Sequence, residues 1–394
     1  MNTTEVFVVS AVRTAVGTFG GTLKDTPPAH LATLVTRAAL ARANCDPQHV
    51  EHVVFGHVLP STPKDAYISR VAALQAGIPK ETPAFGVNRL CGSGLQAIVS
   101  AAQGLLLGDA RIAVAGGAES MSLAPYLVPS ARWGARMGDS KMLDFMLGAL
   151  HDPLHDIHMG ITAENIAKLH GITRADQDAL ALQSQQRAAH AIADGRFADQ
   201  IVPVEVQTRK GVIQFEIDEH VRADVTLEQL AKMKPAFIEG GTVTAGNASG
   251  LNDAACALLL ASGEAVKELG LRPMARLVAY AHAGVEPTLM GLGPIPATRL
   301  ALKRAGLSVA DLDVIESNEA FAAQACTVSR ELGFDPEKVN PNGSGISLGH
   351  PIGASGAIIA TKAIHELHRI KGRYALATMC IGGGQGIAVI FERV

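Results

Sequence analysis

The sequence has few aromatic residues and no large excess of charge of either sign. Only 4% of its 394 residues are Phe, Trp or Tyr, so small residues, including 40 glycines, must fill the interior and let backbones approach closely. The net charge of -3 excludes the global basic field that nucleic-acid-binding proteins use. A chain of this length is expected to fold as two or three packed units.

Cysteine is also scarce, and long apolar runs are missing. The number of cysteines is odd and none forms a CxxC pair; they are Cys45, Cys91, Cys256, Cys326 and Cys380. We therefore expect neither a disulfide framework nor a zinc finger, and a reducing, cytoplasmic compartment. The opening residues show no basic segment followed by a long apolar run, and no stretch of about 20 apolar residues lacks charges or glycines, so neither a signal peptide nor a membrane span is expected.

The sequence repeats itself at a constant offset. Three pairs of similar blocks begin at Ala39 and Ala301, at Ser93 and Ser355, and at Arg111 and Arg373. The difference in position is the same for each pair, and we call it the repeat offset. Each half has amphipathic helices alternating with fully apolar strands, which predicts a duplicated α/β body with a parallel or mixed sheet covered on both faces. We divide the chain into an N-terminal half (1–121), an inserted loop domain (122–250), a return to the first half (251–272) and a C-terminal half (273–394).

Two glycine-rich loops occupy equivalent places in the halves. In NRLCGSGLQ, Cys91 lies between a strand and a helix, where free backbone N–H groups stabilise a thiolate and where Gly92 and Gly94 would let a substrate carbonyl approach. In NPNGSGISLGHPIGASG, His350 precedes the equivalent helix, so the repeat would place it beside Cys91 as the base of an activated nucleophile. The alternatives are a buried structural cysteine and a loop histidine bonded to backbone.

Other segments carry weaker signals. Cys380 ends an apolar strand before three glycines whose free N–H groups suit an oxyanion hole, although such glycines also suit a tight turn. Asn318 lies at a strand-to-helix junction, where it would cap the helix or hold a water or carbonyl. The three histidines of HDPLHDIHMG follow no established metal-site spacing, so no metal is expected.

Seven segments, in order, resemble the thiolase family. They are NRLCGSGLQ, GGAESMS, HMGITAEN, TAGNASGLNDAA, NEAFA, NPNGSGISLGHPIGASG and CIGGGQG, and the resemblance runs from about residue 6 to 394. Within the family, RLCGSGLQAI and PYLVPSARWGARMGDS look closest to bacterial β-ketothiolases (acetyl-CoA C-acyltransferases) of the broad-chain-length type, linked to fatty acid metabolism and polyhydroxyalkanoate monomer supply. The resemblance implies a five-layered α-β-α-β-α fold, a loop domain that binds coenzyme A, a homotetramer built as a dimer of dimers, and no cofactor beyond the CoA substrates.

The resemblance also implies the reaction and the residue roles. The reaction is thiolysis of a 3-ketoacyl-CoA by CoA, or the reverse Claisen condensation with acetyl-CoA. Cys91 would carry the acyl group, His350 would take its proton, and Cys380 would exchange a proton with the acetyl α-carbon. The backbone N–H groups of Cys91 and Gly382 would form one oxyanion hole, and Asn318, through a water, would form the other with His350. The implied substrate contacts are His158, Met159, Arg222, Ser249, Met290 and Phe321.

Two rival functions remain open at this stage. A decarboxylating 3-ketoacyl synthase of the same fold would pair its cysteine with two histidines, or with a histidine and an asparagine, and Cys380 favours the thiolase. A non-catalytic acyl-CoA-binding relative would be expected to lose Cys91, His350 or Cys380, and all three are present.

Overall fold

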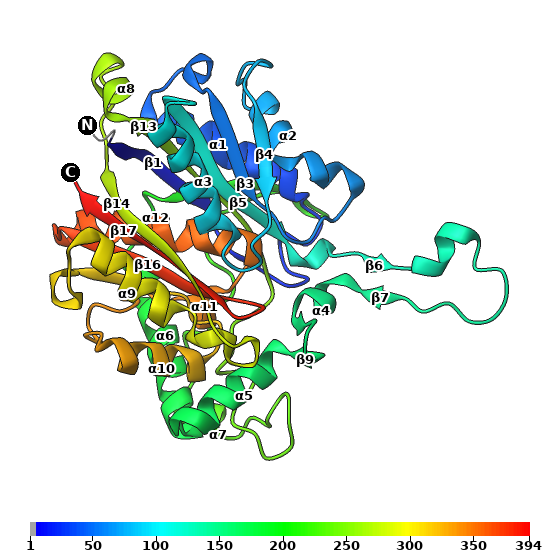
Figure 1. Cartoon of the computed structure of the whole chain (residues 1–394). Helices are drawn as coiled ribbons and strands as arrows, with labels where there is room; N and C mark the ends of the chain where they lie inside the picture. Colours follow the sequence, from blue (N-terminus) through cyan, green and yellow to red (C-terminus); the bar gives the residue numbers. More distant parts are fainter. Residues whose placement is uncertain (1–4) are drawn as a thin grey trace.

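A mixed 11-stranded sheet runs through the computed structural model, which describes residues 5–394 (Figure 1). Nine strands follow one another across it in the order β15-β16-β17-β14-β1-β13-β5-β3-β4. Their bounds are β1 (Val6–Thr14), β3 (His52–Gly56), β4 (Ala84–Val87), β5 (Ile112–Ser120), β13 (Asn252–Ser262), β14 (Ala275–Gly284), β15 (Val314–Ser317), β16 (Tyr374–Ile381) and β17 (Gln385–Arg393). Two-residue strands β2 (Gly17–Thr18) and β10 (Ile201–Val202) pair with β13 and β1.

The strand order shows the predicted duplication. Strands β3 and β15 begin at His52 and Val314, and strands β5 and β16 begin at Ile112 and Tyr374, so the repeat offset separates the members of both pairs. Counting outward from the middle of the sheet, β1, β13, β5 and β3 on one side match β14, β17, β16 and β15 on the other. Among residues 5–394, two residue pairs between β1 and β14 join the backbones of the two half-sheets.

Five layers follow from the way each half-sheet buries both faces. Along β13, alternate residues enter two different hydrophobic clusters, as period-2 strand geometry requires. One cluster holds α1 (Pro28–Ala43) and α2 (Ile68–Gln75), and a second holds α3 (Ser93–Leu107) and α12 (Ile352–Ile370) between the half-sheets. The outer face of the second half-sheet packs on α9 (Pro294–Ala305) and α10 (Ala322–Leu332). The predicted α-β-α-β-α fold is thus confirmed.

The central helices α3 and α12 approach closely at two glycines that are themselves separated by the repeat offset. A Cβ on Gly94 would lie 2.5 Å from the Ala357 nitrogen, and one on Gly356 would lie 2.4 Å from the Leu95 nitrogen. That Gly92 and Gly94 make room for a substrate carbonyl stays a prediction, whereas a Cβ on Gly92 would meet the Ile381 side chain at 2.4 Å. Both glycines serve helix and strand packing.

The segment that includes helix α3 is long and apolar enough to be compared with a membrane-spanning helix. By length and composition, Leu90–Leu107 is the one segment among residues 5–394 that could cross a membrane. More than half of that window is buried, since α3 lies in the middle layer of the core (Figure 1).

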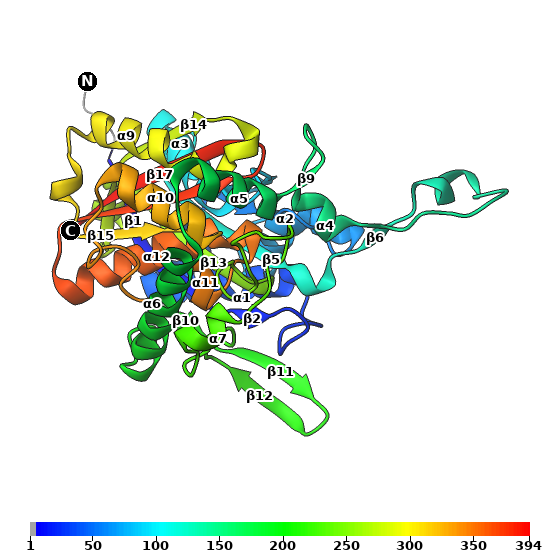
Figure 2. The ribbon, with the colours of Figure 1, turned by 90° about the horizontal axis from the view of Figure 1, so that it is seen from below.

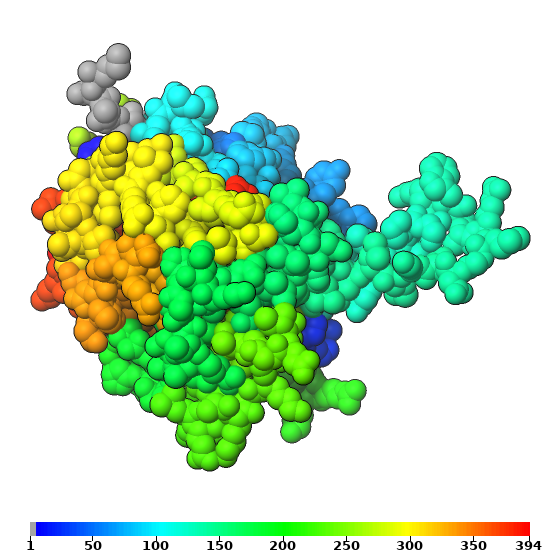
Figure 3. Space-filling view, turned by 60° about the horizontal axis from the view of Figure 1, so that its bottom comes forward, coloured from blue at the N-terminus to red at the C-terminus, as the bar shows by residue number. Residues whose placement is uncertain are grey.

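The segment between the halves lies against one side of the body and sends out two projections. It contains α4 (Phe145–Ala149), α5 (Met159–His170), α6 (Arg174–Ala193) and α7 (Leu227–Ala231). The hairpin of β11 (Val204–Thr208) and β12 (Gly211–Phe215) projects from it, and so does a longer arm between β6 (Tyr126–Leu127) and β7 (Leu143–Asp144) (Figures 2 and 3). Strand β10 returns from this segment to pair with β1. The four-part division of the chain stays a prediction, and residues 1–4 of its first part lie outside the described range.

Candidate active site

One cavity gathers the three residues that the sequence singled out for chemistry. Cys91, His350 and Cys380 all line a cavity of about 440 Å³, although they lie in three segments far apart in sequence. Its wall is mainly apolar, with few polar groups, which is the usual composition of a small-molecule site. The repeat predicted this convergence, because it places the Cys91 and His350 loops at the starts of the two central helices.

Cys91 lies in a strained turn between β4 and α3. Leu90, just before it, has φ of 46°, a left-handed conformation that a branched side chain rarely adopts. The Leu90 N–H donates to Asn88 Oδ1 at 2.9 Å, and the Ser93 hydroxyl donates to the Leu90 carbonyl at 2.7 Å. These bonds hold the turn so that the half-buried Cys91 faces the cavity, an arrangement like the nucleophile elbow of hydrolases.

Burial keeps the thiol of Cys91 protonated at neutral pH. Burial raises its pKa to about 11, and the carboxylate of Glu119 acts in the same direction. Backbone hydrogen bonds from Gly382 and from Cys91 itself oppose this rise without cancelling it. The expectation of a lowered pKa is therefore wrong, because burial outweighs the backbone N–H groups, and Cys91 needs a base. The two N–H groups at the sulfur are the pair expected to form an oxyanion hole.

His350 supplies a neutral imidazole to the same cavity. Burial lowers its pKa to about 4, so the ring is uncharged at neutral pH. Its Nδ1 lies 2.6 Å from Ser355 Oγ, its backbone N–H donates to Asn252 Oδ1 at 2.8 Å, and its buried Nε2 has no hydrogen-bond partner among the described residues. An unprotonated Nε2 at the cavity wall can accept a proton from Cys91.

Cys380 is a second, more deeply buried thiol. It lies near the end of β16, and both burial and the neighbouring Cys91 raise its pKa. The following hairpin into β17 is tight: Gly384 has φ of 80°, and a Cβ there would lie 2.3 Å from the Val285 carbonyl oxygen. Gly382 lines the cavity beside the two thiols. The glycine run is thus both a tight turn and part of the site.

Asn318 does not line the cavity that holds Cys91. It follows β15, but the N-cap of α10 is Phe321, so Asn318 does not cap that helix. It lines a separate, water-sized cavity together with Ser355 and Lys362, and its buried Nδ2 has no hydrogen-bond partner among the described residues. A role for Asn318 at the thioester therefore needs the bridging water that the resemblance implies, and it stays a prediction.

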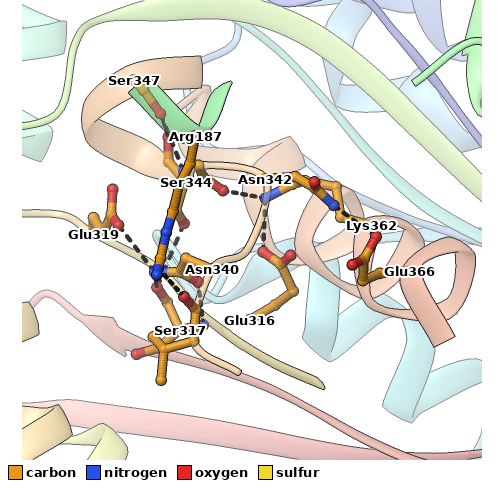
Figure 4. Close-up of polar contacts among 12 residues, drawn as sticks. Arg187, Glu316, Ser317, Glu319, Asn340, Asn342, Ser344, Ser347, Lys362 and Glu366 are labelled. Carbon is orange, nitrogen blue, oxygen red and sulfur yellow. Dashed lines mark hydrogen bonds and ion pairs between the residues drawn. The ribbon is translucent and has the colours of Figure 1, made fainter. Parts of the chain in front are cut away.

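The segment that carries Asn318 is tied to the loop before α12 by a buried polar network (Figure 4). The Asn340 amide accepts a bond from the Ser317 N–H at 2.9 Å and donates to the Ser317 carbonyl at 2.8 Å and to Glu319 at 3.0 Å. Lys362 pairs with Glu316 at 2.7 Å, and both side chains are buried. Such paired groups fix the backbone, because removing one partner leaves the other buried and unsatisfied.

All six predicted substrate contacts line the same cavity as Cys91. These residues are His158, Met159, Arg222, Ser249, Met290 and Phe321. They come from the middle segment and from the second half, so the cavity lies where the loop segment meets the body.

Phe237 is a wall residue that the sequence did not reveal. Its ring stacks on His158 at 4.7 Å between centroids and meets Phe321 edge-on at 6.2 Å. A Cβ on Gly160 would lie 2.3 Å from the Phe237 ring, so Gly160 makes room for it. The residues around Phe237, KMKPAFIEGG, show no pattern that predicts an aromatic side chain in a cavity wall. Gly160, which follows HM, is a sequence signal for this contact, but its meaning is clear only from the fold.

The three histidines of HDPLHDIHMG are not placed to hold a metal ion together, although the rings of His151 and His158 meet edge-on with 5.1 Å between centroids. His151 Nδ1 contacts the Leu147 carbonyl, His155 Nδ1 contacts Asp152 Oδ1, and His158 Nδ1 accepts from the Gly160 N–H. Across residues 5–394, no group of three or more His, Cys, Asp or Glu side chains is placed to hold a metal ion. His158 instead contributes its ring to the cavity wall.

The chain matches known proteins over its whole length. The family models of the thiolase N-terminal and C-terminal domains match residues 6–264 and 271–393. It is 64% identical to the beta-ketothiolase BktB of Cupriavidus necator over 393 residues, which cover 100% of both chains. It is 51% identical to an acetyl-CoA acetyltransferase of Syntrophomonas wolfei, covering 99% of each.

Solved structures give the same result. Human mitochondrial 3-ketoacyl-CoA thiolase superposes with a TM-score of 0.98 at 47% identity, covering 100% of both chains. A structure of that human enzyme in complex with CoA superposes with a TM-score of 0.96, covering 99% of this chain and 98% of the other. Both family models, the full-length relatives and the matching fold agree, and the chain therefore belongs to the thiolase family of acyltransferases.

Proposed function

We propose that this thiolase cleaves 3-ketoacyl-CoA with CoA, and runs the reverse Claisen condensation, through an acyl group carried on Cys91. The observation that carries the proposal is the convergence of Cys91, His350 and Cys380 on one apolar cavity. The test is the loss of acetoacetyl-CoA with and without added CoA. Loss that requires CoA supports the proposal, and loss without CoA, or no loss at all, contradicts it.

The first half-reaction uses all three residues. His350 Nε2 takes the Cys91 proton, and the sulfur attacks the 3-keto carbon of the substrate. The bond between carbons 2 and 3 then breaks, which leaves the acyl group on Cys91 as a thioester and an acetyl-CoA enolate. The Cys380 thiol protonates carbon 2 of that enolate. The raised pKa of Cys380 suits this role, because the thiol holds its proton until a strong base forms.

The second half-reaction returns the free enzyme. The thiol of CoA gives its proton to the Cys380 thiolate and attacks the thioester carbon, and the Cys91 sulfur leaves and takes its proton back from His350. Negative charge on the thioester oxygen is stabilised by the N–H groups of Cys91 and Gly382, which already lie at the sulfur. Each proton and each bond in the cycle is assigned to a protein group or a substrate, so the scheme calls for no resident cofactor.

We expect the enzyme to act beyond four-carbon substrates. The cavity wall includes the flexible side chains of Met159 and Met290, together with Leu147 and Leu150 near its loop side. Acetoacetyl-CoA and 3-ketohexanoyl-CoA should therefore be cleaved with comparable kcat/KM values in a CoA-dependent assay. Activity confined to acetoacetyl-CoA would contradict this.

The oligomer that we propose is a dimer of dimers. Strand β4 ends the sheet, and its outer edge pairs with no strand among residues 5–394 and exposes Phe85. The arm between β6 and β7 stands clear of the body and exposes Trp133 by 83% and Met137 by 96% (Figure 3). Exposed apolar side chains of this size are typical of an association surface.

Changing the arm should change the assembly without unfolding the chain. Sedimentation of the wild type should give four chains, and the double variant Trp133→Ser, Met137→Ser should give two. The matched control is Val212→Ser with Ile213→Ser on the other projection, which is also exposed and should leave four chains. A wild type that sediments as a monomer, or an arm variant that stays tetrameric, would refute this use of the arm.

Cellular setting belongs to the same proposal. Five free cysteines suit a reducing cytoplasm. A broad-chain-length 3-ketoacyl-CoA thiolase would serve fatty acid metabolism or supply monomers for polyhydroxyalkanoate, and the condensation direction is the one that the second role needs.

A further inference from the structure

The hydroxyl of Ser355 lies between two polar partners. Ser355 Oγ lies 2.6 Å from His350 Nδ1 and 2.9 Å from the carbonyl oxygen of Pro351. Ser355 and His350 are both nine-tenths or more buried, so solvent does not compete for these contacts. A serine hydroxyl has one proton to donate and can accept bonds from others. The position of that proton therefore decides the tautomer of the imidazole.

Two arrangements are possible, and they differ by one hydrogen bond. If Ser355 donates to the Pro351 carbonyl, it accepts from an Nδ1–H of His350, and both short contacts are hydrogen bonds. If Ser355 instead donates to Nδ1, the contact with Pro351 carries no proton and a buried Nε2–H is left without an acceptor among the described residues. Within residues 5–394, Nε2 has no partner in either arrangement, as an acceptor in the first and as a donor in the second, so the additional hydrogen bond favours the first arrangement.

We propose that Ser355 is a positioning residue that holds His350 in the Nδ1–H tautomer and so leaves Nε2 as the base for Cys91. This rests on the proposed function, in which His350 takes the Cys91 proton. After that transfer Nε2 carries a hydrogen and can donate to the thioester oxygen, so a single fixed ring serves both steps. Ser355 touches neither substrate nor sulfur in this scheme.

The duplication supports the proposal independently. The repeat-equivalent of Ser355 is Ser93, which lies one repeat offset earlier, in the first turn of α3. Ser93 Oγ donates to the Leu90 carbonyl at 2.7 Å and accepts the Arg89 N–H at 2.9 Å. Both serines thus lie between a carbonyl just upstream of their helix and a nitrogen of the preceding loop, and Ser93 uses the carbonyl as acceptor and the nitrogen as donor. In the first half this arrangement holds the Cys91 turn, and in the second it holds the imidazole.

Neutron diffraction from wild-type crystals tests the tautomer directly, because ordinary X-ray maps do not show the proton. We expect a hydrogen on Nδ1 and none on Nε2. A hydrogen on Nε2 alone overturns the proposal, and this reading holds even if Ser355 variants do not fold. It also holds if the wild type proves inactive, which would refute the proposed function instead.

Kinetics provide the second readout. Ser355→Ala should slow acetylation of Cys91 by acetyl-CoA about 10–100-fold, the usual cost of losing a group that orients a catalytic ligand, with KM nearly unchanged. Ser355→Thr keeps the hydroxyl and should recover most of the rate. Ser100→Ala, on the half-exposed side of α3, is the control and should match the wild type. A folded Ser355→Ala that acetylates at the wild-type rate overturns the proposal.

Discussion

Cys91→Ala is expected to lower the CoA-dependent turnover of acetoacetyl-CoA by at least about 10⁴-fold, which corresponds to about 5.5 kcal/mol of lost transition-state stabilisation. Without the sulfur no acyl-enzyme can form, and His350 and Cys380 have no intermediate on which to act. Substrate binding should survive, because the cavity wall around position 91 keeps all its other side chains. Initial rates and a direct CoA-binding measurement separate the two effects.

The matched control for that variant is another cysteine. Cys326 on α10 is half-buried and does not line the cavity, so Cys326→Ala should keep activity within about twofold of the wild type. If Cys91→Ala retained one tenth or more of the wild-type rate, the nucleophile would have to be another group, and the assigned cycle would be wrong.

Cys380→Ser should separate the two halves of the reaction. A serine hydroxyl has nearly the shape of the thiol but is a far weaker acid, so it neither donates its proton nor forms the basic anion as readily. Proton transfer to and from the acetyl α-carbon should fall by at least about 10³-fold, at the upper part of the range for general acid–base catalysis. Acetylation of Cys91 by acetyl-CoA needs no such transfer and should continue.

Two measurements on one preparation test this separation. Condensation of acetyl-CoA is followed by the appearance of acetoacetyl-CoA, and acetylation by the mass of the protein. A Cys380→Ser enzyme that can no longer be acetylated would show that Cys380 supports the nucleophile rather than the α-carbon. One that still condenses acetyl-CoA at the wild-type rate would assign the acid–base role elsewhere.

The sequence contained most of the fold because the fold is a repeat. The constant offset predicts that β3 and β15, and β5 and β16, are equivalent strands, and it predicts that the loops of Cys91 and His350 meet at the central helices. One contact that the offset also implies was not predicted from the sequence. Gly94 and Gly356, separated by the same offset, lie where the two central helices approach each other. Residues one repeat offset apart occupy equivalent places in the two halves, so the offset alone predicts which segments correspond in the fold.

What the sequence could not predict are properties that depend on surroundings. The expected low pKa of Cys91 came from its place before a helix, but burial, which no local pattern reports, outweighs the backbone N–H groups and raises the pKa to about 11. The roles of Gly92, Phe237 and Ser355 likewise depend on neighbours distant in sequence. Asn318 was expected at the site, and only the structure shows that it faces a separate small cavity.

The most direct test of the account is the mass of the wild-type protein after a short incubation with acetyl-CoA, followed by peptide mapping. We expect one acetyl group per chain, on the peptide that carries Cys91, and its removal when free CoA is added. An acetyl group on another residue, or an acetylated Cys91 that free CoA does not clear, would contradict the proposed acyl-enzyme cycle.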